Sequence, residues 1–181
     1  DWVAIPSTLG REGPAQDYIA GVLERLGFAV SEVPVEPARL ADLPGYGPPE
    51  WSYEGRADVV GLHDPGGDAG RSLAFNGHVD VVSPEPSKLW SASPYEPRIL
   101  EESGETWIYG RGAGDMKGGS VAMLWALAAI RELGLEPAGD VIVQSPIEEE
   151  CSGNGTFALL AAGYGGDGCI IPEPFDETIL V

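Results

Sequence analysis

The chain is poor in cations and has only two histidines and two cysteines among its 181 residues. Lysine and arginine together number 10 against 29 aspartates and glutamates, so the formal net charge is −19. Nucleic acids and anionic membranes would repel such a chain, and we expect neither as a partner. No run of 18 apolar residues is present, so the sequence predicts no membrane span. The surplus of carboxylates suits a cation site but does not prove one.

Cysteine is too scarce for a disulfide framework, and neither Cys151 nor Cys169 belongs to a C-x-x-C pair. We expect both to be small buried residues. The hydrophobic share of 43% predicts a folded core, and the length is typical of one domain. The sequence begins with Asp1, and residues 177–181, "ETILV", have the composition of a strand that has just begun. We therefore expect the chain to be a piece of a longer protein.

The apolar pattern predicts helices and strands that alternate in the second half of the chain. Helices are expected at residues 14–27, 118–133 and 155–162, and strands at 28–35, 57–63, 72–82, 106–110, 140–145 and 168–171. Proline and glycine predict irregular segments at 37–55 and 83–105. The second helix is apolar on nearly all sides and should be buried against a sheet. This order predicts an α/β fold with a mostly parallel sheet flanked by helices.

Acids and one histidine follow four successive predicted strands. They are His78 and Asp80, then Asp115, then Glu148, Glu149 and Glu150, and finally Glu173. Carboxyl ends of parallel strands meet at one edge of a sheet, where so many carboxylates would repel one another without a cation. Taken singly, each has a plainer explanation, because a three-acid run is usually a solvated loop and a lone histidine in a strand is usually structural. The combination is much harder to explain by chance.

The two histidines differ in their surroundings. The spacing of His78 and Asp80 fits a metal-bound imidazole whose other nitrogen donates to a carboxylate. His63 has no such setting and is expected to be a surface residue beside a turn.

The glycine-rich stretch "GRGAGDMKGG", residues 110–119, has a second interpretation as a phosphate-binding loop. The motif G-x-x-x-x-G-K-[ST] needs a glycine directly before its lysine, but Met116 precedes Lys117, and G-x-G-x-x-G fails as well. An acid pointing into a phosphate cradle would also be repelled. The glycines instead favour a sharp turn that presents Asp115 to metal ions. For Lys117 we expect a structural salt bridge.

Four motifs together resemble the M20 family of metallopeptidases and deacylases, which includes acetylornithine deacetylase and succinyl-diaminopimelate desuccinylase. They are "GHVDVV" at 77–82, "YGRGAGDMKGG" at 109–119, "EEECSGNG" at 148–155 and "PEP" at 172–174. The resemblance implies a zinc-peptidase-like catalytic domain, of which residues 1–181 would be the N-terminal portion. The lid or dimerisation domain and the C-terminal catalytic segment would be absent. The complete enzyme is expected to be a cytoplasmic homodimer. The segments "YEGRADVVG" at 53–61 and "EEECSGNG" favour the acetylornithine deacetylase-like branch.

The resemblance also assigns roles to single residues. In a site for two zinc ions, which cobalt or manganese could replace, it implies that His78 and Glu173 bind the first ion and Glu150 the second, with Asp115 bridging both. Asp80 would orient His78, and Glu149 would be the general base that cleaves an N-acyl amino acid or a short peptide. It further implies a cis peptide bond at Asp115-Met116. The family's second metal needs a later histidine, which this chain lacks.

Three hypotheses follow for the chain. It represents an active metallohydrolase whose remaining part is outside this sequence, or a truncated metal-binding product with little turnover, or a metal-free binding module on the same fold. Metal analysis separates the third hypothesis from the other two. A hydrolysis assay separates the first from the second.

Overall fold

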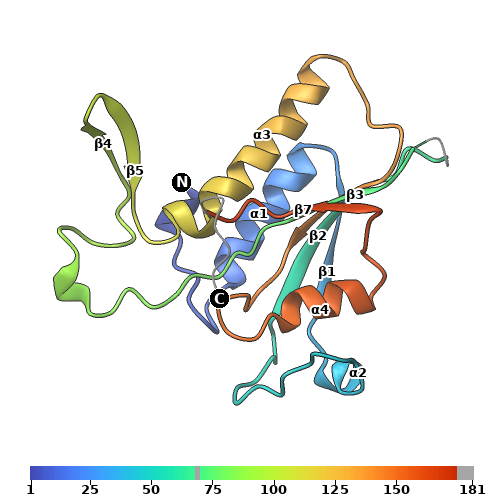
Figure 1. Cartoon of the computed structure of the whole chain (residues 1–181), viewed down its shortest axis with the longest axis horizontal. Coiled ribbons are helices and arrows are strands. Elements are labelled where there is room, and N and C mark those ends of the chain that lie inside the picture. The colour runs from blue at the N-terminus through green and yellow to red at the C-terminus, as the bar shows by residue number, and fades with distance from the viewer. Residues whose placement is uncertain (68–69, 175–181) are drawn as a thin grey trace.

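The computed structural model describes residues 1–67 and 70–174, so the strand expected at 177–181 lies outside it. A five-stranded sheet forms the centre of the molecule, with helices on both faces (Figure 1). Its strands, in spatial order, are β1 (Ala29–Pro34), β2 (Ala57–His63), β6 (Val141–Ser145), β3 (Leu73–Asn76) and β7 (Gly168–Ile170). The predicted α/β fold with flanking helices is confirmed.

The direction of the strands determines where the functional segments meet. β3 pairs in parallel with both β6 and β7, whereas β2 is antiparallel to both β1 and β6. Only β2 therefore runs against the other four strands, and the sheet is mixed. The carboxyl ends of β3, β6 and β7 lie at the same edge, which is where ligands bind in sheets of this kind.

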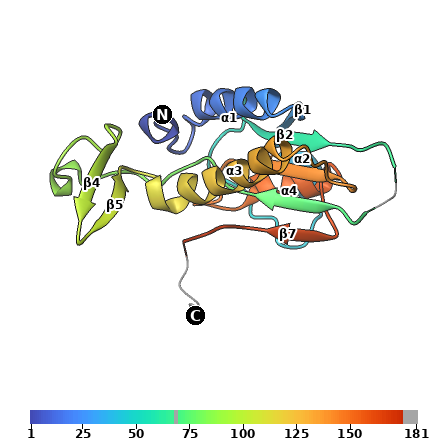
Figure 2. The same ribbon diagram turned by 90° about the horizontal axis from the view of Figure 1, so that it is seen from above.

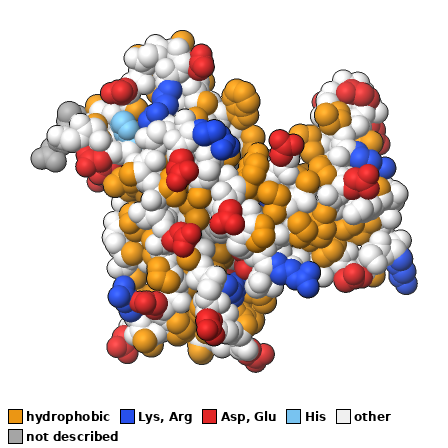
Figure 3. Space-filling view, turned by 180° about the vertical axis from the view of Figure 1, so that it is seen from behind, with side chains coloured by type: hydrophobic (Ala, Val, Ile, Leu, Met, Phe, Trp, Pro, Cys, Tyr) orange, Lys and Arg blue, Asp and Glu red, His pale blue; other side chains and the backbone are white. Residues whose placement is uncertain are grey.

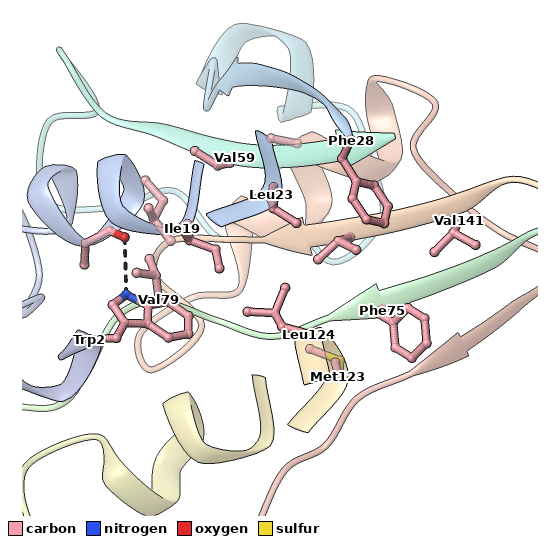
Figure 4. Close-up of a cluster of buried hydrophobic side chains, with 14 of the residues drawn as sticks. Trp2, Ile19, Leu23, Phe28, Val59, Phe75, Val79, Met123, Leu124 and Val141 are labelled. Atoms are coloured by element: carbon pink, nitrogen blue, oxygen red, sulfur yellow. Dashed lines mark hydrogen bonds between the residues drawn. The ribbon is translucent and has the colours of Figure 1, made fainter. Parts of the chain in front are cut away.

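Two helical layers enclose the sheet because its strands alternate apolar side chains between two faces. α1 (Gly13–Arg25) and α3 (Gly119–Glu132) lie on one face, and the short α2 (Pro37–Leu40) and α4 (Asn154–Ala161) lie on the other (Figures 1 and 2). On the first face Val59, Phe75 and Val141 join the core with side chains of α1 and α3 (Figure 4). On the second, Val60, Ala74 and Ile142 pack with Leu159 of α4.

A two-stranded ribbon projects from the body, and it corrects the predicted topology (Figure 1). The strand expected at 106–110 exists as β5 (Glu105–Tyr109), but it pairs only with β4 (Arg98–Glu102), in a passage expected to be irregular. Ser103 and Gly104 both have positive φ and close the two-residue hairpin. Local pairing through this turn keeps β5 out of the central sheet. Asp115 therefore follows a strand of the ribbon, not a strand of the central sheet.

The strand expected at 72–82 is also shorter in the structure, because β3 ends at Asn76. The N–H of Gly77 still donates to the carbonyl of Gln144 in β6, but the next hydrogen bonds go to residues outside the sheet strands. The N–H of Val79 donates to the carbonyl of Pro146 and that of Val81 to the carbonyl of Ser7. Residues 77–82 therefore continue as an extended segment that leads into the functional edge.

The helix α3 is less buried than its composition indicated. Met123, Leu124 and Leu127 face the core, whereas Trp125 is 71% exposed on the outer side. Exposed apolar side chains also occur on the ribbon, and Figure 3 shows hydrophobic side chains spread over the rear surface.

The cysteine prediction was wrong, since Cys151 and Cys169 are both exposed free thiols. Cys169 lies on β7, the edge strand of the sheet, and Cys151 follows the acidic turn. Within the described residues, no helix has both the length and the apolar character that crossing a membrane requires. Two short helical turns, Trp2–Ala4 (η1) and Ser87–Leu89 (η2), complete the elements outside the site.

Candidate metal centre

The extended segment after β3 places His78 in the interior at the functional edge. Side chains alternate along this segment, so Val79 joins the core on one side while His78 and Asp80 point to the other. Gly77 is required because a Cβ there would lie 2.3 Å from the Ser120 hydroxyl oxygen of α3. The adjacent His78 side chain is only 1% exposed.

Asp115 is presented by a single wide helical turn, Ala113–Gly118 (η3), that follows the ribbon. The turn begins after Gly112, whose φ is +78°, and its helical geometry is interrupted at Asp115 and Met116. The Asp115-Met116 peptide bond is cis, as the family resemblance implies. Met116 is fully buried, and its sulfur accepts a hydrogen bond from the His78 backbone N–H at 3.2 Å. This contact anchors Asp115 beside the imidazole and leaves its carboxylate open to solvent.

The three glutamates after β6 form a tight turn that the Asp80 carboxylate holds in place. The N–H groups of Glu149 and Glu150 donate to Oδ1 and Oδ2 of Asp80, each at 3.1 Å. Glu148 has a positive φ of 69°, and its carbonyl accepts from the N–H groups of Ser152 and Gly153. The turn therefore sends Glu148 inward while the next two side chains face the site.

Three carboxylates surround one nitrogen of His78. Its Nε2 lies 3.1 Å from Oδ1 of Asp115, 3.5 Å from Oε1 of Glu173 and 3.6 Å from Oε2 of Glu149. The ligand atoms of His78, Asp115 and Glu173 all lie within 4.8 Å of one another. Glu150 is outside this group and lines an adjacent cavity of about 670 Å³ together with Asp80.

The other nitrogen of His78 is held by Asp80, but not through the oxygen that the sequence suggested. Nδ1 donates to the backbone carbonyl of Asp80 at 2.9 Å, and the Asp80 carboxylate is farther away at 3.5 Å. The orienting hydrogen bond expected from the carboxylate is thus made by the main chain, while the carboxylate holds the glutamate turn. A carbonyl can only accept, so Nδ1 carries a hydrogen, and the neutral form of the ring would offer the Nε2 lone pair to a metal ion.

The electrostatics of the cluster fit a cation. Burial opposes the charged form of His78, yet Asp80, Glu149 and Glu173 outweigh that effect and raise the pKa of the imidazole. Burial raises the pKa of Glu173 to about 7, against the attraction of His78 and with added repulsion from Asp115, Glu149 and Glu150. Crowded carboxylates of this kind repel one another until positive charge is placed among them. One imidazole nitrogen with carboxylate oxygens is a donor set that suits zinc.

Residues 74–180 match the sequence pattern of Peptidase family M20/M25/M40. The chain belongs to this family. It is 36% identical over 175 residues to N-formyl-4-amino-5-aminomethyl-2-methylpyrimidine deformylase of Bacillus subtilis, covering 96% of this chain and 36% of that protein. It is 31% identical over 185 residues to succinyl-diaminopimelate desuccinylase of Rhodospirillum centenum, covering 99% and 43%. The chain therefore spans less than half the length of these M20 relatives.

Solved structures show the same M20 architecture. Human carnosine dipeptidase 1 superimposes with a TM-score of 0.66 at 26% identity, covering 94% of this chain and 36% of that one. The dipeptidase Dug1p of Saccharomyces cerevisiae superimposes with a TM-score of 0.70, again covering 94% of this chain and 36% of that one. At 19% identity this likeness shows the fold alone. The described residues thus correspond to about a third of these longer chains.

Lys117, within the glycine-rich stretch, binds backbone carbonyls rather than a carboxylate. Its ammonium group donates to the carbonyls of Trp2 and Ile5, at 3.2 and 2.8 Å, and lies 5.8 Å from the centre of the Trp2 ring. Burial lowers the pKa of Lys117 to about 8. The expected salt bridge was wrong, since no carboxylate pairs with it in the described part of the chain. Lys117 instead ties the Asp115 turn to η1.

His63 lies outside the metal centre. It is half-buried at the end of β2, with its ring 6.4 Å from that of Phe28 and Nε2 3.3 Å from the Pro137 carbonyl. It is thus a partly exposed residue beside the connection at 64–67, which agrees with the predicted surface position next to a turn. His63 precedes His78 by 15 residues in the sequence, and its ring takes no part in the carboxylate cluster described above.

Gly119 supports the metal centre by allowing two segments to touch. A Cβ at this position, the first residue of α3, would lie 2.1 Å from the backbone carbonyl oxygen of Pro172. Gly119→Ala should therefore displace residues 172–173, lower the free energy of unfolding by about 1–3 kcal/mol and weaken zinc binding. Denaturant unfolding and zinc titration measure the two effects.

The matched control is Gly13→Ala, because Gly13 is the first residue of α1 and a Cβ there meets nothing within 4 Å. This variant should keep both stability and zinc affinity. Equal zinc affinity in the Gly119→Ala variant would show that the contact does not position Glu173.

Proposed function

We propose that this chain is the N-terminal portion of a catalytic domain that hydrolyses an amide bond in an N-acyl amino acid or a short peptide. The observation that carries the proposal is the convergence of Asp115, Glu149 and Glu173 on the free nitrogen of His78. The names of the relatives, a deformylase and a desuccinylase, support acyl removal from nitrogen. The lid domain, the homodimer and the cytoplasmic location remain predictions.

His78, Asp115 and Glu173 would hold the first zinc ion, and Asp115 with Glu150 would contribute to a second. Zinc bound there would lower the pKa of a water molecule and polarise the amide carbonyl of the substrate. Cobalt or manganese would suit the same nitrogen and oxygen donors. Among the described residues only Asp115 and Glu150 would serve the second ion, so full activity would require further ligands.

Glu149 would act as the general base. Its side chain is 46% exposed, so water and substrate can reach it, while Oε2 stays 3.6 Å from Nε2 of His78. It would take a proton from the attacking water and deliver that proton to the leaving nitrogen. Asp80 contributes by holding the Glu149 N–H, which limits the movement of the base.

The test combines metal analysis with an assay of amine release. We expect about one tightly bound zinc in the 181-residue chain and, in a protein that includes the missing ligands, zinc-dependent release of amine. The substrates are N-formyl, N-acetyl and N-succinyl amino acids and dipeptides. Absence of bound metal under non-chelating conditions would exclude the metal site. Rapid turnover by the 181 residues alone would show that the missing ligands are unnecessary and would favour a complete site within this sequence.

A further inference from the structure

A second cluster of polar side chains lies beneath the glutamate turn, separate from the metal centre. Asp58 near the start of β2, Glu148, and Asn154 at the start of α4 are each 0% exposed, and Tyr53 lies beside them at 8%. The sequence places Glu148 in a run of three acids, which is usually a solvated loop. Its complete burial needs an explanation, because a carboxylate is almost never fully buried without a partner.

The cluster contains more hydrogen-bond acceptors than donors. Oδ1 of Asp58 accepts from the N–H of Ile147 at 2.9 Å, but Asp58 Oδ2, both Glu148 carboxylate oxygens and Asn154 Oδ1 have no partner. Asn154 already uses its amide group to donate to the carbonyl of Gly47 and to the Tyr53 hydroxyl. The Tyr53 hydroxyl hydrogen is then the one donor remaining among these four side chains. Buried acceptors without donors are costly, so a further hydrogen is required.

The charges lead to the same conclusion. Arg56 is the cation that acts on Asp58, but its guanidinium group is bound to the buried carboxylate of Glu12. Asp80 and Glu148 face Asp58 with negative charge. Two ionised carboxylates in this setting would repel each other with little compensation.

We propose that Asp58 keeps its proton on Oδ2 at neutral pH and donates a hydrogen bond to the carboxylate of Glu148. Burial raises the pKa of Asp58 to about 8; the Ile147 N–H and Arg56 oppose this shift, and Asp80 and Glu148 add to it. Burial and the neighbouring Glu148 also raise the pKa of Tyr53 to about 12, so its hydroxyl keeps its hydrogen. The carboxyl of Asp58 supplies the missing hydrogen without a bound ion.

This arrangement makes Asp58 a positioning residue for the glutamate turn. Through Oδ1 it holds the N–H of Ile147, and through Oδ2 it holds the side chain of Glu148. Asp80 holds the next two N–H groups, so two aspartates from different segments fix residues 147–150. That Glu149 then acts as a base rests on the proposed function, but the proton on Asp58 does not.

The test is Asp58→Asn, because asparagine keeps an acceptor for Ile147 and an N–H donor for Glu148 but cannot ionise. In the unfolded chain the ordinary pKa of Asp58 is near 3.8, so rising pH favours unfolding of the parent between about pH 4 and 8. Thermal unfolding of both proteins is measured at each pH, and the midpoint of the parent is subtracted from that of Asp58→Asn. This difference should grow from pH 5 to pH 8 and then stay constant. Asp42→Asn, at an exposed acid, should show a difference that does not change with pH.

Activity provides the positioning readout in a protein with full turnover. Asp58→Asn should retain kcat within about threefold and the same zinc content, whereas Asp58→Leu, which removes both contacts, should lose at least tenfold in kcat. A midpoint difference that is independent of pH between pH 5 and 8 would overturn the proposal by showing that Asp58 is ionised in the folded protein. The unfolding measurement requires no turnover, so a failure of the proposed function would not be mistaken for a failure here.

Discussion

Glu149→Gln should lower the turnover of the zinc-loaded enzyme by about 100- to 10,000-fold while its zinc content stays nearly unchanged. Glutamine has the shape of glutamate but cannot take a proton from water. The backbone contact between Glu149 and Asp80 does not involve the replaced group, so the turn should stay in place. Steady-state kinetics and elemental analysis of the same preparation measure the two quantities.

Glu150→Gln is the matched control because it changes the neighbouring acid in the same way. Burial and the nearby Asp115 carboxylate raise the pKa of Glu150, which places it among the acids that a second ion would neutralise. This variant should lose zinc from the second site together with activity. Loss of zinc in the Glu149 variant, with retention in the Glu150 variant, would mean that the two proposed roles are exchanged.

His78→Ala should abolish tight zinc binding and, with it, turnover. The imidazole contributes the one nitrogen around which the three site carboxylates gather, and no other histidine lies near them in the described residues. Changes to groups that merely orient a ligand already weaken metal binding by about 10- to 100-fold, so the loss of a ligand should exceed this range. Zinc competition with a chromophoric chelator measures the affinity.

The control is His63→Ala, which removes the only other histidine of the sequence. His63 packs near Phe28 and lies outside the carboxylate cluster, so this variant should keep its zinc. Circular dichroism must show that the His78 variant is folded, because His78 is buried. A folded His78→Ala protein that binds zinc as tightly as the parent would rule out the proposed first site.

Much of the fold could be predicted from local pattern. The apolar periodicity of α1 and the apolar runs of β2 and β6 indicated elements that the structure places within two residues of their expected bounds. The ribbon could not be predicted in the same way. β5 has the composition of a sheet strand, but it pairs with β4 because a two-residue turn brings that partner close first. Strand composition does not specify the neighbour of a strand.

The extent of burial also depended on information that local pattern does not contain. Trp125 lies in a helix that is apolar on nearly all sides yet is 71% exposed, and Glu148 lies in a run of acids yet is 0% exposed. One signal was available, because Asp58 interrupts the otherwise apolar β2 strand with an acid. A polar residue within a buried strand predicts a polar partner, but not which residue supplies it.

The sequence by itself determined the chemistry available at this site. The order of His78, Asp115, Glu149, Glu150 and Glu173 after turns and strands indicated the family and a cation site, because ligand types and spacing are local properties. Only the tertiary structure decided how they are held. The Asp80 carboxylate meets backbone N–H groups 69 and 70 residues later in the chain, and its carbonyl rather than its carboxylate orients His78. Such contacts arise from the parallel alignment of β3 with β6, and no local sequence pattern records that pairing.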